Sequence, residues 1–338
     1  MKTIAFFNNK GGVGKTSLVY HLAWKFADIG LRVIAVDLDP QSNLTAIFLN
    51  EERLEELWPE GRHPSTVFGY VQPLLREGGI GSVHIEPIND RIGLIVGDLA
   101  LSGFEGELSL QWNNCRSENV DQRYRAFLVT CAFSRLIQEA DALFKADITL
   151  IDVGPNLGAI NRAALIAADY VVVPLAPDLF SIQGLRNLGP TLRDWRAEWK
   201  TNLEKVPDFE GWNAPNGEMK PAGYIVMRHS VRLDRPTKAF RRWIERMPGE
   251  YRQHMLEQRS DLGNGDNNRI ATLKDYQSLI PLAHEANKPI FNLTQADGAL
   301  GSHFIAAQEA GGHFETVARG IAERVGIALP ERQRSVMI

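Results

Sequence analysis

The chain has 338 residues, of which 44% are hydrophobic and 23% are charged, and its formal net charge is -4. This composition is typical of a globular protein and excludes one that is basic throughout, although a local basic surface remains compatible with it. The two cysteines, Cys115 and Cys131, are too few for a disulfide framework and form no Cys-x-x-Cys pair for a metal. We therefore expect reduced thiols and a cytoplasmic protein.

Short apolar runs, separated by segments of helical length, recur along the chain. Helical spacing of apolar residues predicts one helix over 16–29, ending at Gly30, and another over 159–168. The apolar runs predict buried strands at 3–7, 33–36, 92–96, 148–151, 170–173 and 224–227. This alternation predicts an α/β fold with a doubly wound, mostly parallel sheet and helices on both faces. Ligands of such sheets bind at the carboxyl ends of the strands.

Residues 50–147 are less regular, with one clear strand and a long charged passage at 105–125. The segments 207–220 and 261–268 are rich in Gly, Asn, Pro or Asp and predict surface loops. No boundary separates two domains, so we expect a single domain over residues 1–338. Within it, residues 50–147 form an elaborated region that could serve as a partner surface.

The strongest motif stands between the first strand and the first helix, and it reads Lys10, Gly11, Gly12, Val13, Gly14, Lys15, Thr16, Ser17. Glycines let the backbone fold tightly around an anion, and the following helix adds its positive N-terminal end. Lys15 can reach the β- and γ-phosphates of a nucleotide, and the Thr16 hydroxyl can bind Mg²⁺. The ordinary P-loop pattern has a glycine where this chain has Asn9, so the motif is a deviant one with a second lysine, Lys10.

Three aspartates follow predicted strands after this loop. Asp37 and Asp39 stand two residues apart at a strand end, where they can address the Mg²⁺ shell and an attacking water. Asp152 ends a later apolar strand, the usual place of a carboxylate that supports Mg²⁺ opposite a P-loop. A single aspartate at a strand end is more often a turn or cap residue. Three of them in this order favour a site for a magnesium nucleotide.

These motifs together resemble the ParA/MinD family of deviant Walker-type ATPases, and the ParA-type partition branch most. The resemblance is clear from residue 3 to about residue 188 and includes Asp152-Val-Gly-Pro-Asn156 and Phe180-Ser-Ile-Gln-Gly-Leu185. The first nucleotide motif begins within ten residues of Met1, so we expect no helix-turn-helix before it.

The resemblance implies an ATP hydrolase that needs Mg²⁺ and forms a homodimer with ATP sandwiched between the subunits. Residues 11–17 would hold the nucleotide, and Thr16, Asp37 and Asp152 would serve the metal. Lys10 would reach the partner's phosphates, Lys15 would contact the phosphates of its own subunit, and Asp39 would orient the attacking water. The segment 154–158 would move with nucleotide state, and a ParB-like protein would stimulate hydrolysis.

A basic segment at 228–252 is the candidate surface for non-specific DNA binding, and its proposed contacts are Arg232, Arg235, Lys238, Arg241, Arg242 and Arg246. DNA binding would make the protein nucleoid-associated. A solvated helix face is the ordinary alternative for such a charge run. Arg193, Arg196 and Lys200 form a weaker second candidate. The C-terminal tail is interrupted by Pro330, so no amphipathic membrane helix is expected.

Two other functions remain open at this stage. The chain could be an ATP-dependent regulator or scaffold that acts on a protein without binding DNA, with the elaborated region as its docking surface. A metabolic or metal-cluster relative with the same P-loop is disfavoured by the lack of a cysteine pair.

Overall fold

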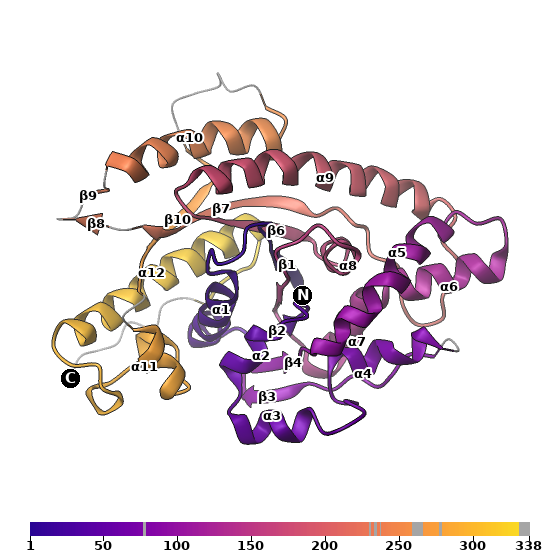
Figure 1. Cartoon of the computed structure of the whole chain (residues 1–338), viewed down its shortest axis with the longest axis horizontal. Helices are drawn as coiled ribbons and strands as arrows, with labels where there is room; N and C mark the ends of the chain where they lie inside the picture. The colour runs from indigo at the N-terminus through magenta and orange to yellow at the C-terminus, as the bar shows by residue number, and fades with distance from the viewer. Residues whose placement is uncertain are drawn as a thin grey trace.

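The computed structural model describes residues 1–76, 79–229, 231–232, 235–236, 238–258, 266–276 and 279–330, with the description limited to the backbone at 228–240 (Figure 1). Its centre is an eight-stranded sheet with the strand order β10-β7-β6-β1-β5-β2-β4-β3. All neighbouring strands of this sheet are parallel except β3 and β4. The strands are β1 Lys2–Phe6, β2 Val33–Asp37, β3 Glu86–Asn89, β4 Ile92–Ile95, β5 Ile148–Asp152, β6 Tyr170–Leu175, β7 Lys220–His229 and β10 Arg269–Lys274. A separate antiparallel pair joins β8 (Val231–Arg232) to β9 (Arg235–Pro236).

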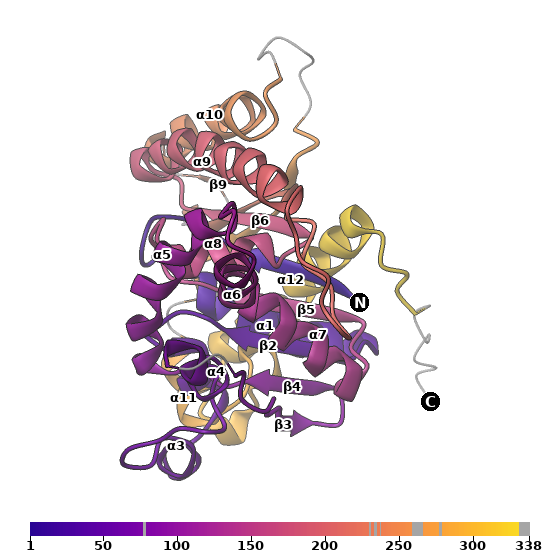
Figure 2. The ribbon, with the colours of Figure 1, turned by 90° about the vertical axis from the view of Figure 1, so that its right-hand side faces the viewer.

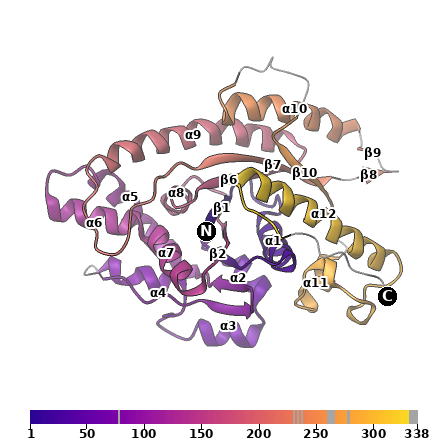
Figure 3. The ribbon, with the colours of Figure 1, turned by 180° about the vertical axis from the view of Figure 1, so that it is seen from behind.

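Helices cover both faces of the sheet, which confirms the doubly wound α/β prediction (Figures 1 and 3). One face is covered by α1 Lys15–Ile29, α2 Asn43–Phe48, α3 Glu51–Leu57, α11 Ile280–Glu285 and α12 Ser302–Val325. The other is covered by α4 Val67–Val71, α5 Glu105–Asn114, α6 Val120–Thr130, α7 Ala132–Phe144, α8 Ala159–Ile166 and α9 Leu179–Leu203. Helix α10 (Lys238–Met255) lies on the outer side of α9 (Figure 2). Short 3-10 helices are η1 Gln72–Leu75, η2 Leu99–Phe104, η3 Ile290–Asn292 and η4 Gln295–Asp297.

The central strands are apolar throughout because both of their faces are buried. In β1, Ile4 and Phe6 pack into the core layer with α1 and α12, whereas Ala5 packs into the layer with α7 to α9. The same alternation holds in β2, where Val33 and Ile34 face opposite layers. Successive side chains of a strand point to opposite faces, so a run of apolar residues supplies both layers at once.

The elaborated region differs from its sequence-based description. The passage 105–125 is not irregular, because it forms α5 and most of α6, and the region contributes a second strand, β3, at the antiparallel edge of the sheet. Helix α5 buries only a narrow stripe that includes Leu108 and Trp112, while Leu110 is 60% exposed. Its apolar spacing is therefore weak, and the charged exposed positions hide the helical period.

The segment 207–220 connects α9 to β7 as a loop, as expected, but part of it belongs to the core. Phe209 and Trp212 are buried and stack with their ring centroids 4.1 Å apart. Residues 261–265 of the other predicted loop lie outside the described residues. In the part of the chain that the structure describes, no helix has both the length and the apolar character needed to cross a bilayer.

Candidate phosphate-binding site

Three adjacent strands bring the predicted motifs together at one edge of the sheet. Strand β5 lies between β1 and β2, and its last residue, Asp152, pairs in register with Phe6 on one side and Asp37 on the other. The glycine-rich loop follows β1, and Asp39 follows β2. Parallel strands end at the same edge, so the loop and the aspartates converge there.

The loop between β1 and α1 takes backbone conformations that favour glycine. Gly12 has φ +71° and Gly14 has φ +90°, and Gly14 is the N-cap of α1. Side chains other than glycine are strained in this left-handed region. The loop thus opens directly onto the positive N-terminal end of a 15-residue helix, an arrangement that favours a bound anion.

Lys15 stands at the first turn of α1 and is almost buried, with 7% of its surface exposed. Burial lowers the pKa of its ammonium group, while the negative charges of Asp152 and Asp39 act in the opposite direction. A lysine close to buried carboxylates keeps a positive charge at the site, which a phosphate group can contact.

Of the three aspartates, Asp152 is the one whose carboxylate has the fewest partners. It is fully buried, and among the residues that the structure describes neither carboxylate oxygen has a partner in good hydrogen-bond geometry, although the Thr16 hydroxyl lies close enough to favour the charged form. Burial raises the pKa of Asp152 to about 7, and the nearby Thr16 hydroxyl and Lys15 ammonium oppose this shift. Native proteins rarely leave such a group unpaired. An unpaired carboxylate beside a threonine hydroxyl fits a hydrated Mg²⁺, which commonly uses one or two carboxylates together with water and phosphates.

Other clusters of metal ligands are absent from the described part of the chain, where no three His, Cys, Asp or Glu side chains group as a metal site. A Mg²⁺ ion here would therefore depend on Thr16, Asp152 and the phosphates of a bound nucleotide.

Asp37 differs from Asp152 because its oxygens are already engaged. Its Oδ2 accepts hydrogen bonds from the backbone N–H and the hydroxyl of Thr45, both at 2.8 Å. Burial first, and then the charge of Asp152, raise the pKa of Asp37 to about 8. Gly97 leaves room for this carboxylate, since a Cβ atom there would lie 2.8 Å from it. Asp37 thus anchors α2 to the sheet and stands behind the site.

Asp39 faces the segment 154–158, which follows β5. Its Oδ1 accepts a hydrogen bond from the backbone N–H of Gln41 at 3.0 Å. A Cβ atom on Gly154 would lie 3.3 Å from the same oxygen. Asp39 is 7% exposed, so its carboxylate lies at the wall of the site.

Lys10 does not point toward the loop's own helix. Its ammonium forms an ion pair with Asp178, the N-cap of α9, and lies 5.7 Å from the ring centre of Phe180. About a third of each charged side chain is exposed, at 30% and 33%. This pair was not foreseen from the sequence, although an aspartate three residues before Ser181 is a recognisable cap signal.

Asn161 is a second residue that sequence reasoning missed. It is 1% exposed, and its Nδ2 donates to the backbone oxygens of Gly154 at 2.8 Å and Asn156 at 2.6 Å. A single amide side chain thereby clamps the segment 154–158. The available signal was an amide residue in the first turn of a helix whose other residues, apart from Arg162, are apolar.

A small cavity of about 60 Å³ adjoins the loop on the side of α12, lined by residues that include Gly14, Ser17, Met227, Leu273, Tyr276 and Phe314. Its walls come from the first turns of α1 and, in the C-terminal half of the chain, from α12 and the ends of β7 and β10. The cavity is mostly apolar and partly aromatic, and at about 60 Å³ it is well below the usual size of a ligand pocket.

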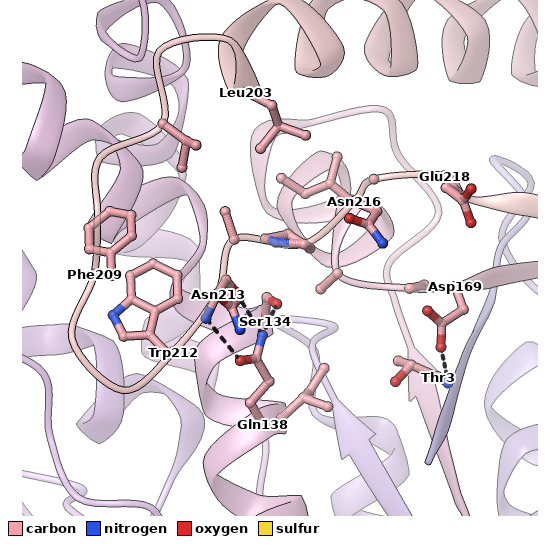
Figure 4. Close-up of a pocket in the computed structure, with 18 of the residues that line it drawn as sticks. Thr3, Ser134, Gln138, Asp169, Leu203, Phe209, Trp212, Asn213, Asn216 and Glu218 are labelled. Carbon is pink, nitrogen blue, oxygen red and sulfur yellow. Dashed lines mark hydrogen bonds between the residues drawn. The ribbon is translucent and has the colours of Figure 1, made fainter.

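Another cavity, of about 930 Å³, lies at the opposite end of the sheet (Figure 4). It is bounded by Thr3 and Asp169 at the amino ends of β1 and β6, and by Trp212 and Asn216 of the loop before β7. None of the loop residues 10–17 lines it. Its size therefore does not mark it as the phosphate site.

The basic segment is partly described. Helix α10 includes Arg241, Arg242 and Arg246, whereas the side chains of Arg232, Arg235 and Lys238 lie outside the described residues. Arg241 is 71% exposed and pairs with Glu245 along the helix. Arg246 pairs with Glu250, and both Arg242 and Arg246 lie over the ring of Trp243. In the weaker candidate group, Arg193 pairs with Glu257 and donates to the backbone oxygen of His254, so it ties α9 to the end of α10.

Comparison with known proteins agrees with this geometry. A family model described as an AAA domain matches residues 1–205, more than half of the chain. Protein IncC of Escherichia coli is 32% identical over 203 residues, which cover 59% of this chain and 47% of IncC. The chromosome-partitioning ATPase Soj of Thermus thermophilus is 31% identical over 198 residues, covering 58% of this chain and 64% of Soj.

The chain belongs to the ParA family of P-loop ATPases. The fold of this ParA-type chain is also that of a Corynebacterium diphtheriae protein whose crystal structure covers 96% of this chain and 99% of its own, with a TM-score of 0.69 and 25% identity. The matched part spans about half to two thirds of the length of IncC and Soj. The family assignment and the sequence resemblance therefore agree.

His21, on α1 of the ParA-type domain, connects this helix to residues from the C-terminal part of the chain. Its Nδ1 lies 2.6 Å from the backbone oxygen of Ser17, and its Nε2 accepts from the backbone N–H of Ile290 at 3.1 Å. The ring also stacks on Phe314. Burial lowers the pKa of His21 to about 4 from an ordinary value of 6.5, and the charge of His284 acts in the same direction.

We expect the stability of the protein to fall as the pH decreases from 6.5 to 4, because in this window the unfolded chain binds a proton that the folded His21 does not. Above pH 6.5 the neutral His21 ring does not lower the free energy of unfolding. Between pH 6.5 and 4 that free energy falls by about 1 kcal/mol for each pH unit. Thermal unfolding of the wild type and of His21→Gln measures it. The variant has no titrating ring, so its unfolding temperature should depend less on pH, and identical slopes would contradict the assignment.

Proposed function

We propose that the chain is a Mg²⁺-dependent ATPase of the partition or positioning type, which dimerises on ATP and holds DNA without sequence specificity. The observation that carries the nucleotide part is the unpaired, buried Asp152 carboxylate beside Lys15 and Thr16, at the foot of a glycine loop. Membership of the ParA family supports ATP as the substrate.

In this proposal the backbone N–H groups of residues 11–17 surround the phosphates, and Lys15 neutralises charge on the β- and γ-phosphates. Thr16 and Asp152 would hold a Mg²⁺ ion, which would supply charge neutralisation on the phosphate oxygens. The carboxylate of Asp39 orients the attacking water. Hydrolysis then depends mainly on positioning and electrostatics.

Lys10 would act across a dimer interface. In the single chain it is paired with Asp178, so reaching a partner's phosphate requires that this exposed ion pair be broken. Exposed pairs of this kind contribute only about 0–1 kcal/mol, which a contact to a phosphate can replace. We propose that ATP-driven pairing of two subunits releases Lys10 from Asp178.

The DNA contact is proposed for α10 and the residues before it. Arg241 and Arg242 are exposed. They belong to α10, which lies on the outer side of α9 (Figure 2), so their charges are available to phosphates. Soj is named as a chromosome-partitioning ATPase, which supports a role in moving or positioning DNA or another cargo. A stimulating partner of the ParB type, a cytoplasmic location and association with the nucleoid complete the proposal.

DNA retardation with ATP and Mg²⁺ at several salt concentrations tests the proposal. The wild type should retard duplexes of unrelated sequence only with ATP, and retardation should weaken as salt rises. The double variant Arg241→Ala/Arg242→Ala should bind at least about tenfold more weakly at 100 mM salt, because each subunit loses two phosphate contacts. Arg62→Ala/Arg76→Ala is the matched control, since it removes two exposed arginines from the elaborated region. Equal losses in both variants would contradict the assignment of α10.

A regulator or scaffold that acts on a protein without DNA is the second candidate. Exposed apolar residues in the elaborated region favour it, namely Leu99 at 60%, Leu110 at 60% and Val120 at 61%. Absence of any retardation at low salt, in a wild type that hydrolyses ATP, would replace the first candidate by this one.

A further inference from the structure

Glu105, the first residue of α5, caps a helix that belongs to the phosphate site. Its Oε1 accepts from the backbone N–H of Ala159 at 2.5 Å, and its Oε2 accepts from that of Ile160 at 2.8 Å. Ala159 and Ile160 are the first residues of α8, which begins directly after the segment 154–158. Two N–H groups that the helix leaves unpaired are thus bound by one carboxylate, 54 residues away in the sequence.

The contact between Glu105 and the start of α8 leaves little space for a side chain at the neighbouring residue 158. Gly158, the N-cap of α8, has an extended backbone with φ -77°, which any residue can adopt. A Cβ atom there would nevertheless lie 2.5 Å from Glu105 Oε1 and 2.8 Å from Asn156 Oδ1. A side chain at this position would therefore displace the Glu105 carboxylate from its contact with α8, although the backbone itself would accept it.

The same helix holds the segment that faces the candidate catalytic aspartate. Asn161, in the first turn of α8, donates to the backbone oxygens of Gly154 and Asn156. Gly154 in turn lies against Asp39. A continuous set of contacts therefore leads from Glu105 through α8 and Asn161 to the wall of the phosphate site.

Helix α5 is itself a firm support for this cap. Trp112 of α5 stacks on Trp199 of α9 at 5.5 Å, and the guanidinium of Arg162 on α8 lies 4.1 Å from the Trp112 ring centre. The indole N–H of Trp112 donates to Glu198 at 2.6 Å. A displacement of α5 by anything bound to its exposed face would therefore be transmitted to α8.

We propose that Glu105 is a positioning residue for ATP hydrolysis, which fixes the start of α8 and the segment 154–158 and so couples the elaborated region to the phosphate site. The inference rests on the proposed ATPase function. Glu105 touches no reacting atom; it acts through α8 and Asn161.

Steady-state hydrolysis and nucleotide binding, measured separately, test the proposal. We expect Glu105→Ala to lower kcat about five- to tenfold, since it removes a charged cap from two N–H groups. The Kd for ATP should stay within about twofold, because the glycine loop is unchanged. Glu105→Gln keeps an acceptor oxygen and should restore kcat to within about threefold of the wild type.

Glu107→Ala is the matched control on the same helix. Glu107 accepts from Arg125 at 2.9 Å and ties α5 to α6 instead of α8. This variant loses the same charge and should keep kcat within about twofold. A fall in kcat as large as that of Glu105→Ala would show a general effect of charge on α5 and would overturn the proposal.

Gly158→Ala perturbs the same contact between Glu105 and α8, at the α8 end of the contact. We expect it to lower kcat by displacing the Glu105 carboxylate, and the double variant Glu105→Ala/Gly158→Ala should lose less than the product of the two single losses. Fully multiplicative losses would mean that the two residues act independently and would contradict the proposal.

Hydrogen exchange of the amides in residues 154–163 separates this inference from the ATPase function. Glu105→Ala should raise their exchange relative to both the wild type and Glu107→Ala, with or without ATP. If the wild type proved unable to hydrolyse ATP, the proposed function would fail, and faster exchange would still support the cap as the holder of this segment. Unchanged exchange in Glu105→Ala would overturn the inference whatever the ATPase result.

Discussion

Replacing Lys15 by alanine is expected to weaken ATP binding at least about 100-fold, because the variant loses the one ammonium that stands inside the glycine loop among buried carboxylates. The variant also removes the positive charge that offsets Asp152 and Asp39, so no ammonium opposes the negative charge of the phosphates at this point. The pKa of Asp152, already raised by burial, would rise further when this cation is removed. Titration with a fluorescent ATP analogue measures the effect.

Lys200→Ala is the control for this change, since Lys200 is an exposed lysine on α9, remote from the loop. It should bind ATP within about twofold of the wild type. An affinity of Lys15→Ala within about threefold of the wild type would show that phosphates bind elsewhere, and the nucleotide site would have to be placed at another cavity.

Replacing Asp39 by alanine is expected to abolish ATP hydrolysis while ATP binding is retained, in contrast to the loss of binding expected for Lys15→Ala. We expect the hydrolysis rate to fall about 100- to 1000-fold, since a positioned group that activates water contributes about this much. ATP affinity should change less than about threefold, because Asp39 lies at the wall of the site and not in the glycine loop. The variant should therefore persist as an ATP-bound dimer, which light scattering on a sizing column detects.

Asp39→Asn distinguishes the carboxylate from its part in the turn. Its side-chain oxygen can still accept from the backbone N–H of Gln41, so the loop after β2 is preserved. If orienting water is the role of Asp39, the asparagine variant should lose hydrolysis as well. Normal hydrolysis in either variant would remove Asp39 from the catalytic group.

Much of the fold was predictable because the central strands are short, apolar and flanked by helical periods. The six predicted strands correspond to β1, β2, β4, β5, β6 and β7, and the predicted helices to α1 and α8. Gly30 does end α1, with φ +110°. Strand β3 was missed because an edge strand with one exposed face has no continuous apolar run, and α5 and α6 were missed because their buried stripes are narrow.

The sequence alone determined the chemistry available at the strand ends: a glycine loop with two lysines, and three aspartates at the ends of two strands. Local spacing suffices for this, because residues that follow parallel strands must meet at one edge of the sheet. Only the tertiary structure decided which partner each of these side chains has. Asp37 is engaged by Thr45, Asp152 is buried without a partner, and Lys10 is held by Asp178. The cap that Glu105 places on α8 likewise arises from packing between helices far apart in the chain, a contact that no local pattern of residues encodes.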